Sequence, residues 1–487
     1  DLPRPAPTPV VRMSLVLFDT LRRAEVEFVP AVEGRVGMYV CGPTVQAEPH
    51  VGHGRAAVVF DLLRRHLQHS GLAVRYVQNV TDIDDKIILR ARREGTDAAA
   101  IATRYGRVFE RTMDALGVLP PDVRPLATGH LLEMQELVTA LIDAGRAYVV
   151  EGDVFFRVRS FPAYGRLSNR RVDELVEGED VVDADRKEDP LDFALWKAAK
   201  PGEPSWPSPW GHGRPGWHLE CSAMSVAHLG AGFDIHGGGL DLVFPHHENE
   251  IAQHEAAHGT TFARHWVHNG MVTMGEAKMS KSVGNVVGLG DAVAAVGRGP
   301  LRLWYLSAQH RTPLTFDDDR LADASTVFAR FLTFARAARR AAGGAAPDGA
   351  AGRRHRDAFV AALDDDLNAP VAVAALHELV ADGGERLRRP DAEAGALTDL
   401  AGTLVELADD VLGLGVADVL AEEAALGARL APLVEDALAR RAEARAAKDF
   451  AAADAIRDRL ASAGVVVEDS AAGAVWHVPV RPAAAPR

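Results

Sequence analysis

A strand–helix–strand pattern near the start of this 487-residue sequence constrains its fold more than any other feature. Residues 35–40 (RVGMYV) are apolar and β-branched, as in a buried strand, and a Cys-Gly-Pro turn follows them. Residues 52–70 carry apolar side chains at helical spacing and stop before Gly71. Residues 72–80 (LAVRYVQNV) predict a second strand. Such a βαβ unit indicates a mostly parallel sheet, with ligands bound at the carboxyl ends of its strands.

The rest of the chain predicts further domains, because a single hydrophobic core does not serve so many residues. Residues 145–169 have strand character with turn residues, which is typical of antiparallel pairing. Residues 200–217 hold five prolines, which excludes a regular helix and leaves a linker or an ordered loop facing a ligand. The sheet resumes at residues 232–244. From about residue 300 the pattern is helical, and residues 420–480 predict a long amphipathic helix followed by a small hairpin.

Composition and charge exclude several classes of protein. The sequence has only two cysteines, so a disulfide framework is excluded. No apolar run approaches the ~18 residues that span a bilayer. The first twelve residues hold four prolines and no apolar segment, so we expect a flexible extension rather than a signal peptide, and a cytoplasmic protein. The net charge of −14 argues against a nucleic-acid coat protein but leaves room for a local basic surface.

Four side chains make a candidate set of zinc ligands. The cysteines lie in two separate motifs, MYVCGPTV and GWHLECSAM. The motif FPHHENEIAQH adds an imidazole and a carboxylate four positions apart, which share one face of a predicted helix. The set is Cys41, Cys221, His246 and Glu250. Each cysteine taken singly is equally well explained as a small buried hydrophobic residue.

The same helix offers one reserve ligand. His254 lies one turn beyond Glu250 and is expected to face the same way, whereas His247 and Glu248 are expected to point elsewhere. A purely structural zinc site is the alternative. Such sites usually take closely spaced cysteine pairs, and these two cysteines are single and remote, so we favour an active-site zinc.

Two short motifs are suited to binding phosphates. His50, Gly52 and His53 lie at the start of a predicted helix, where unpaired N–H groups and the helix dipole favour anions. The glycine permits close approach, and the histidines can donate hydrogen bonds to a phosphate in the transition state. Lys278 and Lys281, in the flexible stretch EAKMSKSVGN, can neutralise a pyrophosphate leaving group. Alone, the first motif could be an accidental match and the second a solvated basic loop.

Together the two motifs resemble the HIGH and KMSKS signatures of class I aminoacyl-tRNA synthetases. Further stretches are similar to cysteinyl-tRNA synthetases: MYVCGPTV, YVQNVTDIDDKI, EPSWPSPWG, GRPGWHLECSAM, DIHGGGLDLVFPHHENEIAQ and DALARRAEARAAKDFAAADAIRDRL. The resemblance extends from about residue 14 to residue 478.

The resemblance implies a zinc ion at the floor of an amino-acid pocket, held by the four residues of the candidate set. Zinc prefers a thiolate to a hydroxyl, so it would separate cysteine from serine, which shape alone discriminates by only ~1–3 kcal/mol. No editing domain is then expected. By the same resemblance Thr81 and Trp217 line the pocket; the alternatives are a strand-end cap and a core aromatic residue.

The implied reaction forms cysteinyl-adenylate from L-cysteine and ATP, and then transfers the cysteinyl group to tRNA(Cys). His50 and His53 would contact the phosphates and Gly52 the adenine side. Lys278 and Lys281 would contact the pyrophosphate, with Mg²⁺ accompanying ATP. A loop that holds adenosine is implied at Gly237, Gly238, Gly239 and Asp241, although three glycines can also form a plain turn.

Anticodon reading would fall to the C-terminal region of a protein that we expect to be a monomer. There Arg440, Arg441, Arg445 and Lys448 could meet phosphates, and Trp476 could stack on a base. The alternative is an amphipathic helix with a core tryptophan.

The predicted fold class is an α/β Rossmann-type parallel-sheet catalytic domain with a small inserted domain, followed by an α-helical bundle and a small C-terminal α+β domain. The expected boundaries are a flexible extension at 1–13, the catalytic domain at 14–120 and 218–275, a connecting insertion at 121–217, a KMSKS-loop junction at 276–325, the bundle at 326–419, an anticodon-binding domain at 420–480 and a tail at 481–487.

Two rival functions are compatible with parts of this pattern. A related ligase activates cysteine identically but passes it to an amino-sugar in low-molecular-weight thiol (mycothiol) synthesis, and it has a shorter C-terminal part. The presence of residues 420–480 favours tRNA as the acceptor. A catalytically silent RNA-binding relative is the other rival, and the intact signature motifs and metal ligands speak against it.

Overall fold

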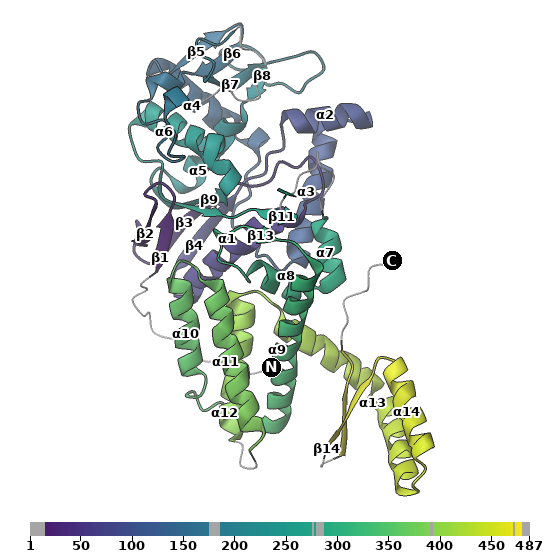
Figure 1. Cartoon of the computed structure of the whole chain (residues 1–487). Helices are drawn as coiled ribbons and strands as arrows, with labels where there is room; N and C mark the ends of the chain where they lie inside the picture. The colour runs from purple at the N-terminus through teal and green to yellow at the C-terminus, as the bar shows by residue number, and fades with distance from the viewer. Residues whose placement is uncertain are drawn as a thin grey trace.

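The computed structural model describes residues 15–174, 186–274, 277–278, 287–389, 393–470 and 473–479. The predicted extension at 1–13 and tail at 481–487 lie outside these residues. Figure 1 shows an elongated molecule with a parallel sheet near its middle, a small antiparallel sheet at one end and a helical bundle at the other. None of the helices in the described ranges is long and apolar enough to cross a membrane.

The central sheet has four parallel strands in the order β10, β9, β3, β4. Their bounds are Ala263–Asn269, Phe233–Gly239, Arg35–Val40 and Ala73–Gln78. Helix α1 (Val51–His69) joins β3 to β4, which confirms the predicted βαβ unit and parallel sheet. Val40 of β3 pairs with both Gln78 of β4 and Gly237 of β9, so the carboxyl ends of these three strands meet at one edge of the sheet.

The insertion between the two halves of the parallel sheet holds a second sheet, which confirms the predicted antiparallel pairing. Its strands run in the order β5 (Ala147–Val150), β6 (Asp153–Phe156), β7 (Phe193–Ala198) and β8 (Gly213–Pro215). The proline-rich stretch 200–217 contains β8 and is an ordered loop rather than a linker. The α-helices between β4 and β10 in the chain are α2 (Asp85–Glu94), α3 (Ala98–Ala115), α4 (Leu131–Asp143), α5 (Trp217–Leu229) and α6 (Glu248–His258).

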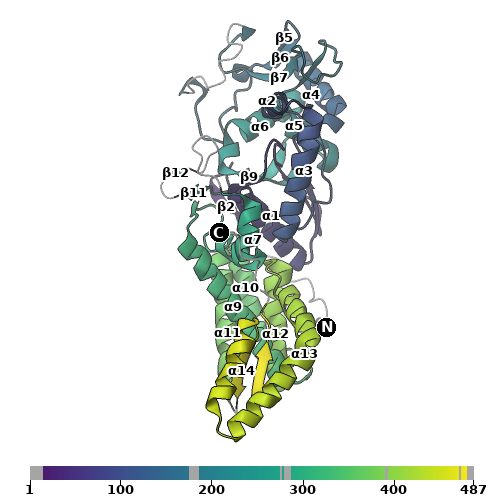
Figure 2. The same cartoon turned by 90° about the vertical axis from the view of Figure 1, so that its right-hand side faces the viewer.

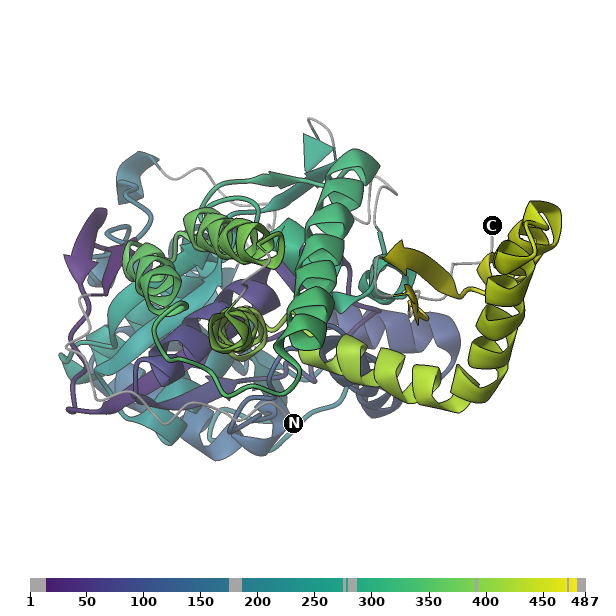
Figure 3. The same ribbon diagram turned by 90° about the horizontal axis from the view of Figure 1, so that it is seen from below.

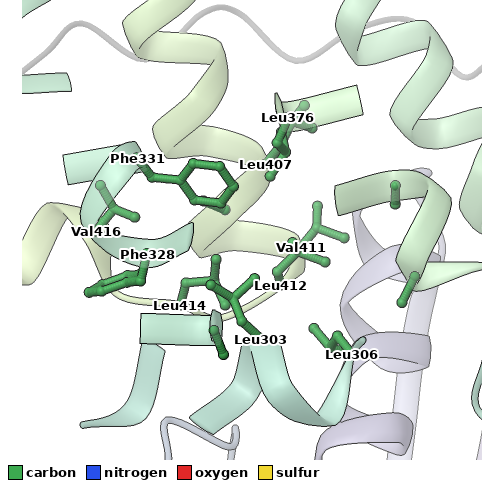
Figure 4. Packing of buried hydrophobic residues seen from close by; sticks show 14 of the residues in the cluster. Leu303, Leu306, Phe328, Phe331, Leu376, Leu407, Val411, Leu412, Leu414 and Val416 are labelled. Atoms are coloured by element: carbon green, nitrogen blue, oxygen red, sulfur yellow. The ribbon is translucent and has the colours of Figure 1, made fainter. Parts of the chain in front are cut away.

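The helical bundle shares one apolar core with the catalytic half. Its helices are α9 (Asp318–Ala342), α10 (Arg353–Asp364), α11 (Ala369–Leu387) and α12 (Ala394–Val405), followed by the π-helical turn η7 (Glu406–Val411). They are preceded by α7 (Leu289–Val296) and α8 (Arg298–Tyr305). Figure 4 shows this core where α8, α9, α11 and η7 meet, through buried side chains that include Leu303, Leu306, Phe328, Phe331, Leu376, Leu407, Val411 and Leu412.

The C-terminal unit begins with a helix that leaves the bundle, α13 (Val416–Ala446), and continues with α14 (Phe450–Ser462). Strands β14 (Val466–Ser470) and β15 (Gly473–His477) form the predicted hairpin. Figures 2 and 3 show this unit beside the bundle, and Figure 2 shows it at the end of the molecule away from the β5–β7 strands.

The prediction of one long helix in the C-terminal unit is wrong, because the helix is interrupted between α13 and α14. Lys448 adopts a left-handed backbone conformation (φ +61°), and Asp449 caps α14 by accepting from the Ala452 amide at 3.0 Å. The prediction that Arg441 contacts phosphates is also at odds with the structure. Arg441 is only 5% exposed, and its guanidinium makes two hydrogen bonds, 2.7 and 2.8 Å, to Asp469 of β14. Trp476 packs against the small apolar core of this unit, as in the alternative interpretation.

Candidate active site

The four predicted metal ligands come together although they lie on separate elements. Cys41 follows β3 and Cys221 lies on α5, whereas His246 lies in the π-helical turn Val243–His247 and Glu250 in the first turn of α6, which follows that turn directly. Their donor atoms are all within 4.8 Å of one another. The two sulfurs are 3.6 Å apart, and the Cys41 sulfur is 3.5 Å from Glu250 Oε1. His246 Nε2 is 3.1 Å from the same oxygen.

These separations suit a tetrahedral zinc ion. With zinc bonds of about 2.3 Å to sulfur and 2.0–2.1 Å to nitrogen or oxygen, tetrahedral edges measure about 3.8 Å between two sulfurs, about 3.5 Å between sulfur and oxygen, and about 3.4 Å between nitrogen and oxygen. The observed distances differ from these values by 0.3 Å or less, so small movements of the side chains would complete the site. The cluster can therefore hold a metal ion, and its sulfur-rich donor set favours zinc.

A second group of donors overlaps the first, through His236 and His247. His236 Nε2 lies 2.7 Å from Glu250 Oε2, and His247 Nε2 lies 3.2 Å from the Cys41 sulfur. The distance from His236 to Glu250 is well below the tetrahedral edge of about 3.4 Å and matches an ordinary hydrogen bond, so His236 orients Glu250 as outer partners commonly do around metal ligands. The distance from His247 to Cys41 departs from its tetrahedral edge by about as much as the distance from His246 to Glu250 does, so His247 is a further candidate donor at this cluster.

The prediction that His247 points elsewhere is wrong. A π-helical turn at Val243–His247 precedes α6, with non-helical backbone at Phe244, so the simple helical spacing does not hold there. Glu248 does point away, since it accepts from the backbone and hydroxyl of Ser168, both at 2.8 Å. The reserve ligand His254 is not part of the cluster, because its Nε2 lies 3.1 Å from the Thr260 hydroxyl.

Burial shapes the chemistry of the cluster in the absence of a cation. Desolvation raises the pKa of Cys41 and of Glu250 well above their usual values, and it lowers the pKa of His246. A bound cation would reverse this for the thiol and the carboxyl, because its positive charge stabilises thiolate and carboxylate. The ring of Trp217 stacks on His246 at 4.4 Å and is 38% exposed, which rules out the core-aromatic alternative.

The histidine motif forms the N-terminal cap of α1. His50 Nδ1 accepts from the Gly52 amide at 3.1 Å, and His53 Nδ1 accepts from the His50 amide at 3.1 Å. An amide can only donate, so each neutral ring carries its proton on Nε2. A Cβ atom at Gly52 would lie 2.9 Å from the His50 ring, so the ring position requires glycine there. Both histidines therefore present Nε2–H donors at a helix N-terminus, and they line a cavity of about 150 Å³.

The segment beyond the KMSKS motif is paired with this cap. The Val51 amide donates to Val287 O at 3.1 Å, and the Leu289 amide donates to Pro49 O at 2.9 Å. Lys278 lies in strand β12 (Ala277–Lys278), and Lys281 lies outside the described residues. The chain that follows the KMSKS motif, from residue 287 onward, is therefore held against the start of α1.

The three glycines predicted to form a loop lie instead within strand β9. A Cβ at Gly237 would stand 2.3 Å from Phe60 of α1, and one at Gly238 would stand 2.7 Å from His247. One at Gly239 would stand 2.5 Å from the carboxylate of Asp241, which is exposed just beyond the strand. The absence of side chains here brings α1, His247 and Asp241 close to the strand end.

Asn79 is a functional residue that the sequence did not reveal. Its Oδ1 accepts from the Gly42 amide at 2.7 Å, and a Cβ at Gly42 would stand 1.6 Å from the Asn79 carbonyl oxygen. Asn79 therefore holds the turn that carries Cys41. The buried hydroxyl of nearby Thr81 donates to Glu220 Oε2 at 2.6 Å, so Thr81 lies at the same sheet edge.

Comparisons with known proteins identify the family to which the chain belongs. The sequence profile of the tRNA synthetases class I (C) catalytic domain matches residues 27–326. A cysteine–tRNA ligase of Clavibacter michiganensis subsp. michiganensis is 48% identical over 493 residues, covering 96% of this chain and 99% of its own. The chain belongs to the cysteinyl-tRNA synthetase family. Profiles of the DALR domain and of the cysteinyl-tRNA ligase anticodon binding domain match residues 358–417 and 428–476 of this cysteinyl-tRNA synthetase family member.

Other relatives support the family and the fold. A cysteine–tRNA ligase of Desulfitobacterium hafniense is 46% identical over 475 residues, covering 95% of this chain and 99% of its own. Methionyl-tRNA synthetase of Mycobacterium tuberculosis, solved in complex with methionyl-adenylate, superposes with a TM-score of 0.60 at 18% identity, over 79% of this chain and 93% of its own. The superposition with methionyl-tRNA synthetase shows a shared fold, which confirms the predicted architecture of a Rossmann-type catalytic domain with helical additions.

Proposed function

We propose that the chain is a cysteine–tRNA ligase that acts in the cytoplasm. It activates L-cysteine with ATP to form cysteinyl-adenylate and passes the cysteinyl group to the 3′ end of tRNA(Cys). One observation carries the proposal: Cys41, a member of the candidate metal cluster, and the histidine cap of α1 both follow the carboxyl end of β3, joined by the loop from Cys41 to His50. An amino acid held at the cluster therefore lies beside a site suited to phosphates.

The amino-acid pocket would use a zinc ion for selection. Cys41, Cys221, His246 and Glu250 would hold it, and the donor separations support this set. Bound there, zinc supplies a soft Lewis acid that takes a thiolate in preference to a hydroxyl. Trp217 would line the pocket because it stacks on His246 and is partly exposed, and Thr81 because it stands at the same sheet edge.

Activation would consist of positioning and charge stabilisation around the α-phosphorus, which the cysteine carboxylate attacks as pyrophosphate leaves. His50 and His53 would donate from Nε2 to phosphate oxygens, and Gly52 would allow close approach on the adenine side. Lys278 and Lys281 would neutralise the pyrophosphate, with Mg²⁺ accompanying ATP.

The adenosine of ATP would lie at the carboxyl end of β9. The strand ends with Gly237, Gly238 and Gly239, which have no side chains to cover it. The exposed carboxylate of Asp241 can accept hydrogen bonds from ribose hydroxyls. The acceptor would be tRNA rather than an amino-sugar, because α13, α14 and the β14–β15 hairpin are present and match the profile of an anticodon binding domain.

The test is exchange of pyrophosphate into ATP by the purified full-length chain. Exchange should require cysteine and should not proceed with serine, and tRNA that reads cysteine codons should then be charged. Active protein should contain one zinc per chain. Exchange without tRNA charging, together with acylation of an amino-sugar, would establish the rival ligase; failure of cysteine-dependent exchange would refute both.

A further inference from the structure

A cluster of buried charges joins the catalytic half to the bundle, and it is separate from the active site. Asp61 of α1 and Arg302 of α8 are 2% and 0% exposed, and Arg302 Nη2 donates to Asp61 Oδ2 at 2.6 Å. Arg65, one turn along α1, donates to the same carboxylate oxygen at 2.8 Å. Two guanidinium groups therefore share one buried carboxylate.

Both arginines also bind backbone carbonyls at the end of η7: Arg65 those within η7, and Arg302 that of the first residue of the loop that follows it. Arg302 Nε donates to Leu412 O at 2.7 Å, and Arg65 Nη1 donates to the carbonyls of Asp409 and Asp410 at 3.2 and 3.3 Å. Gly413 has a left-handed backbone (φ +69°), and a Cβ atom there would stand 2.6 Å from the Arg302 guanidinium carbon. The loop is therefore shaped to fit the arginine.

Asp409 of η7 also fixes the start of α13. The carboxylate of Asp409 accepts from the amides of Val416 and Ala417, each at 2.7 Å, and so caps the helix that carries the C-terminal unit. Arg298 of α8 donates to Leu414 O at 3.4 Å and forms an ion pair with Asp418 in the first turn of α13. A continuous polar chain thus runs from α1 through the loop to α13.

We propose that Asp61, Arg65, Arg302 and Asp409 form a rigid joint that sets the direction of α13, and through it the position of the C-terminal unit relative to the active site. Arg302 is then a positioning residue for the tRNA-dependent step. An apolar contact could slide, whereas a planar guanidinium bound to a carboxylate and two carbonyls defines one orientation. The inference rests on the proposed function, because a fixed span matters only if one ligand touches both ends.

The test replaces Arg302 by lysine, which keeps the charge beside Asp61 but cannot reproduce the planar fork. Cysteine-dependent pyrophosphate exchange should stay within about twofold of the parent, whereas kcat/KM for full-length tRNA should fall about tenfold, the size of typical coupling effects. A short RNA hairpin that mimics only the acceptor stem should be charged equally by both proteins, because it does not reach α13.

Arg64→Lys is the matched control. Arg64 is buried like Arg302 but lies on α1. Its partners, Pro120 O at 2.6 Å and Asp122 at 3.0 Å, belong to the catalytic half alone. This variant should charge full-length tRNA like the parent. If Arg302→Lys does not fold, Arg298→Ala, at a more exposed site, provides the second test. It should lower kcat/KM for full-length tRNA by a smaller factor and leave pyrophosphate exchange unchanged.

Three outcomes would refute the proposed joint. They are an equal loss of pyrophosphate exchange and of tRNA charging, an equal loss of charging for full-length tRNA and for the hairpin, and unchanged charging of full-length tRNA by the folded variants. Absence of exchange in the parent would instead count against the proposed function, so the two failures are distinguishable.

Discussion

Replacing Tyr305 tests how the start of α1, the proposed phosphate-binding site, is held in place. Tyr305 of α8 is fully buried and donates to the carbonyl of Val51, the first residue of α1, at 2.7 Å. Gly54 lies so close that a Cβ atom there would stand 2.2 Å from the Tyr305 oxygen. Helix α8 therefore fixes the turn of α1 that presents His50 and His53.

Tyr305→Phe removes one hydrogen bond and keeps the ring. Such a bond contributes about 0.5–1.5 kcal/mol net, and the lower half applies because the Val51 carbonyl also accepts a helical hydrogen bond. We expect the free energy of unfolding to fall by about 0.5–1 kcal/mol. The kcat of cysteine-dependent pyrophosphate exchange should fall by up to about fivefold if the loss acts fully on the transition state.

A double-mutant cycle with Gly54→Ala sharpens the test. The new methyl group should cost about 1–3 kcal/mol by overpacking, partly offset by about 1 kcal/mol of helix propensity. Removing the Tyr305 hydroxyl takes away the closest contact, so the double variant should be more stable than the sum of the single effects by about 1 kcal/mol.

Urea denaturation and exchange kinetics measure both quantities. Tyr148→Phe is the control, because it removes a buried hydroxyl bound to Asp192 in the insertion and should leave the exchange kcat unchanged. Strict additivity in the cycle, or an unaltered kcat and stability for Tyr305→Phe, would show that α8 does not hold the cap.

Three further predictions concern the metal, the core and pH. Cys221→Ser should abolish stoichiometric zinc, measured by elemental analysis, and raise the KM for cysteine at least about tenfold; unchanged selectivity over serine would refute the recognition role. Phe331→Ala, at a fully buried position in the bundle core, should lower the unfolding free energy by about 3–5 kcal/mol in thermal or urea melts, and a change below 1 kcal/mol would contradict the packing. The hydrogen bond from Arg441 lowers the pKa of Asp469 to about 2, so this pair should stabilise the C-terminal unit above pH 4, and the contribution should vanish as the pH falls through about 2. Asp469→Asn should remove that part of the acid dependence in circular dichroism titrations, and an identical titration would contradict it.

Local patterns were sufficient for much of the fold. The strand at 35–40 has its predicted bounds, and α1 begins beside the predicted phosphate motif. Both follow from signals within one element, namely β-branched apolar runs and helical spacing with a turn residue at the end. The break at Lys448 could not be predicted in the same way, because nothing in a lysine marks a left-handed backbone conformation.

The candidate site was predictable from spacing along the chain only in part. His246 and Glu250 stand at i and i+4 and their donor atoms do meet at 3.1 Å, although His246 lies in the π-helical turn before α6 and not in α6 itself. The role of His247 depends on a π-helical turn, whose presence no periodicity reveals. Asn79 can hold the turn that carries Cys41, and His236 can hydrogen-bond to Glu250, only because β4 and β9 flank β3.

The parallel sheet explains why such distant motifs converge. β3 leads to Cys41 and then to the loop that ends at His50, β4 leads to Asn79 and Thr81, and β9 leads to the π-helical turn with His246 and then to α6 with Glu250. All three strands point the same way, so the residues that follow their ends arrive at one edge. The presence of three of the four candidate metal ligands and of the N-terminus of α1 at this edge is therefore a consequence of the topology, and local backbone features adjust their positions: a cap at His50, a glycine at position 42 and a π-helical turn before α6.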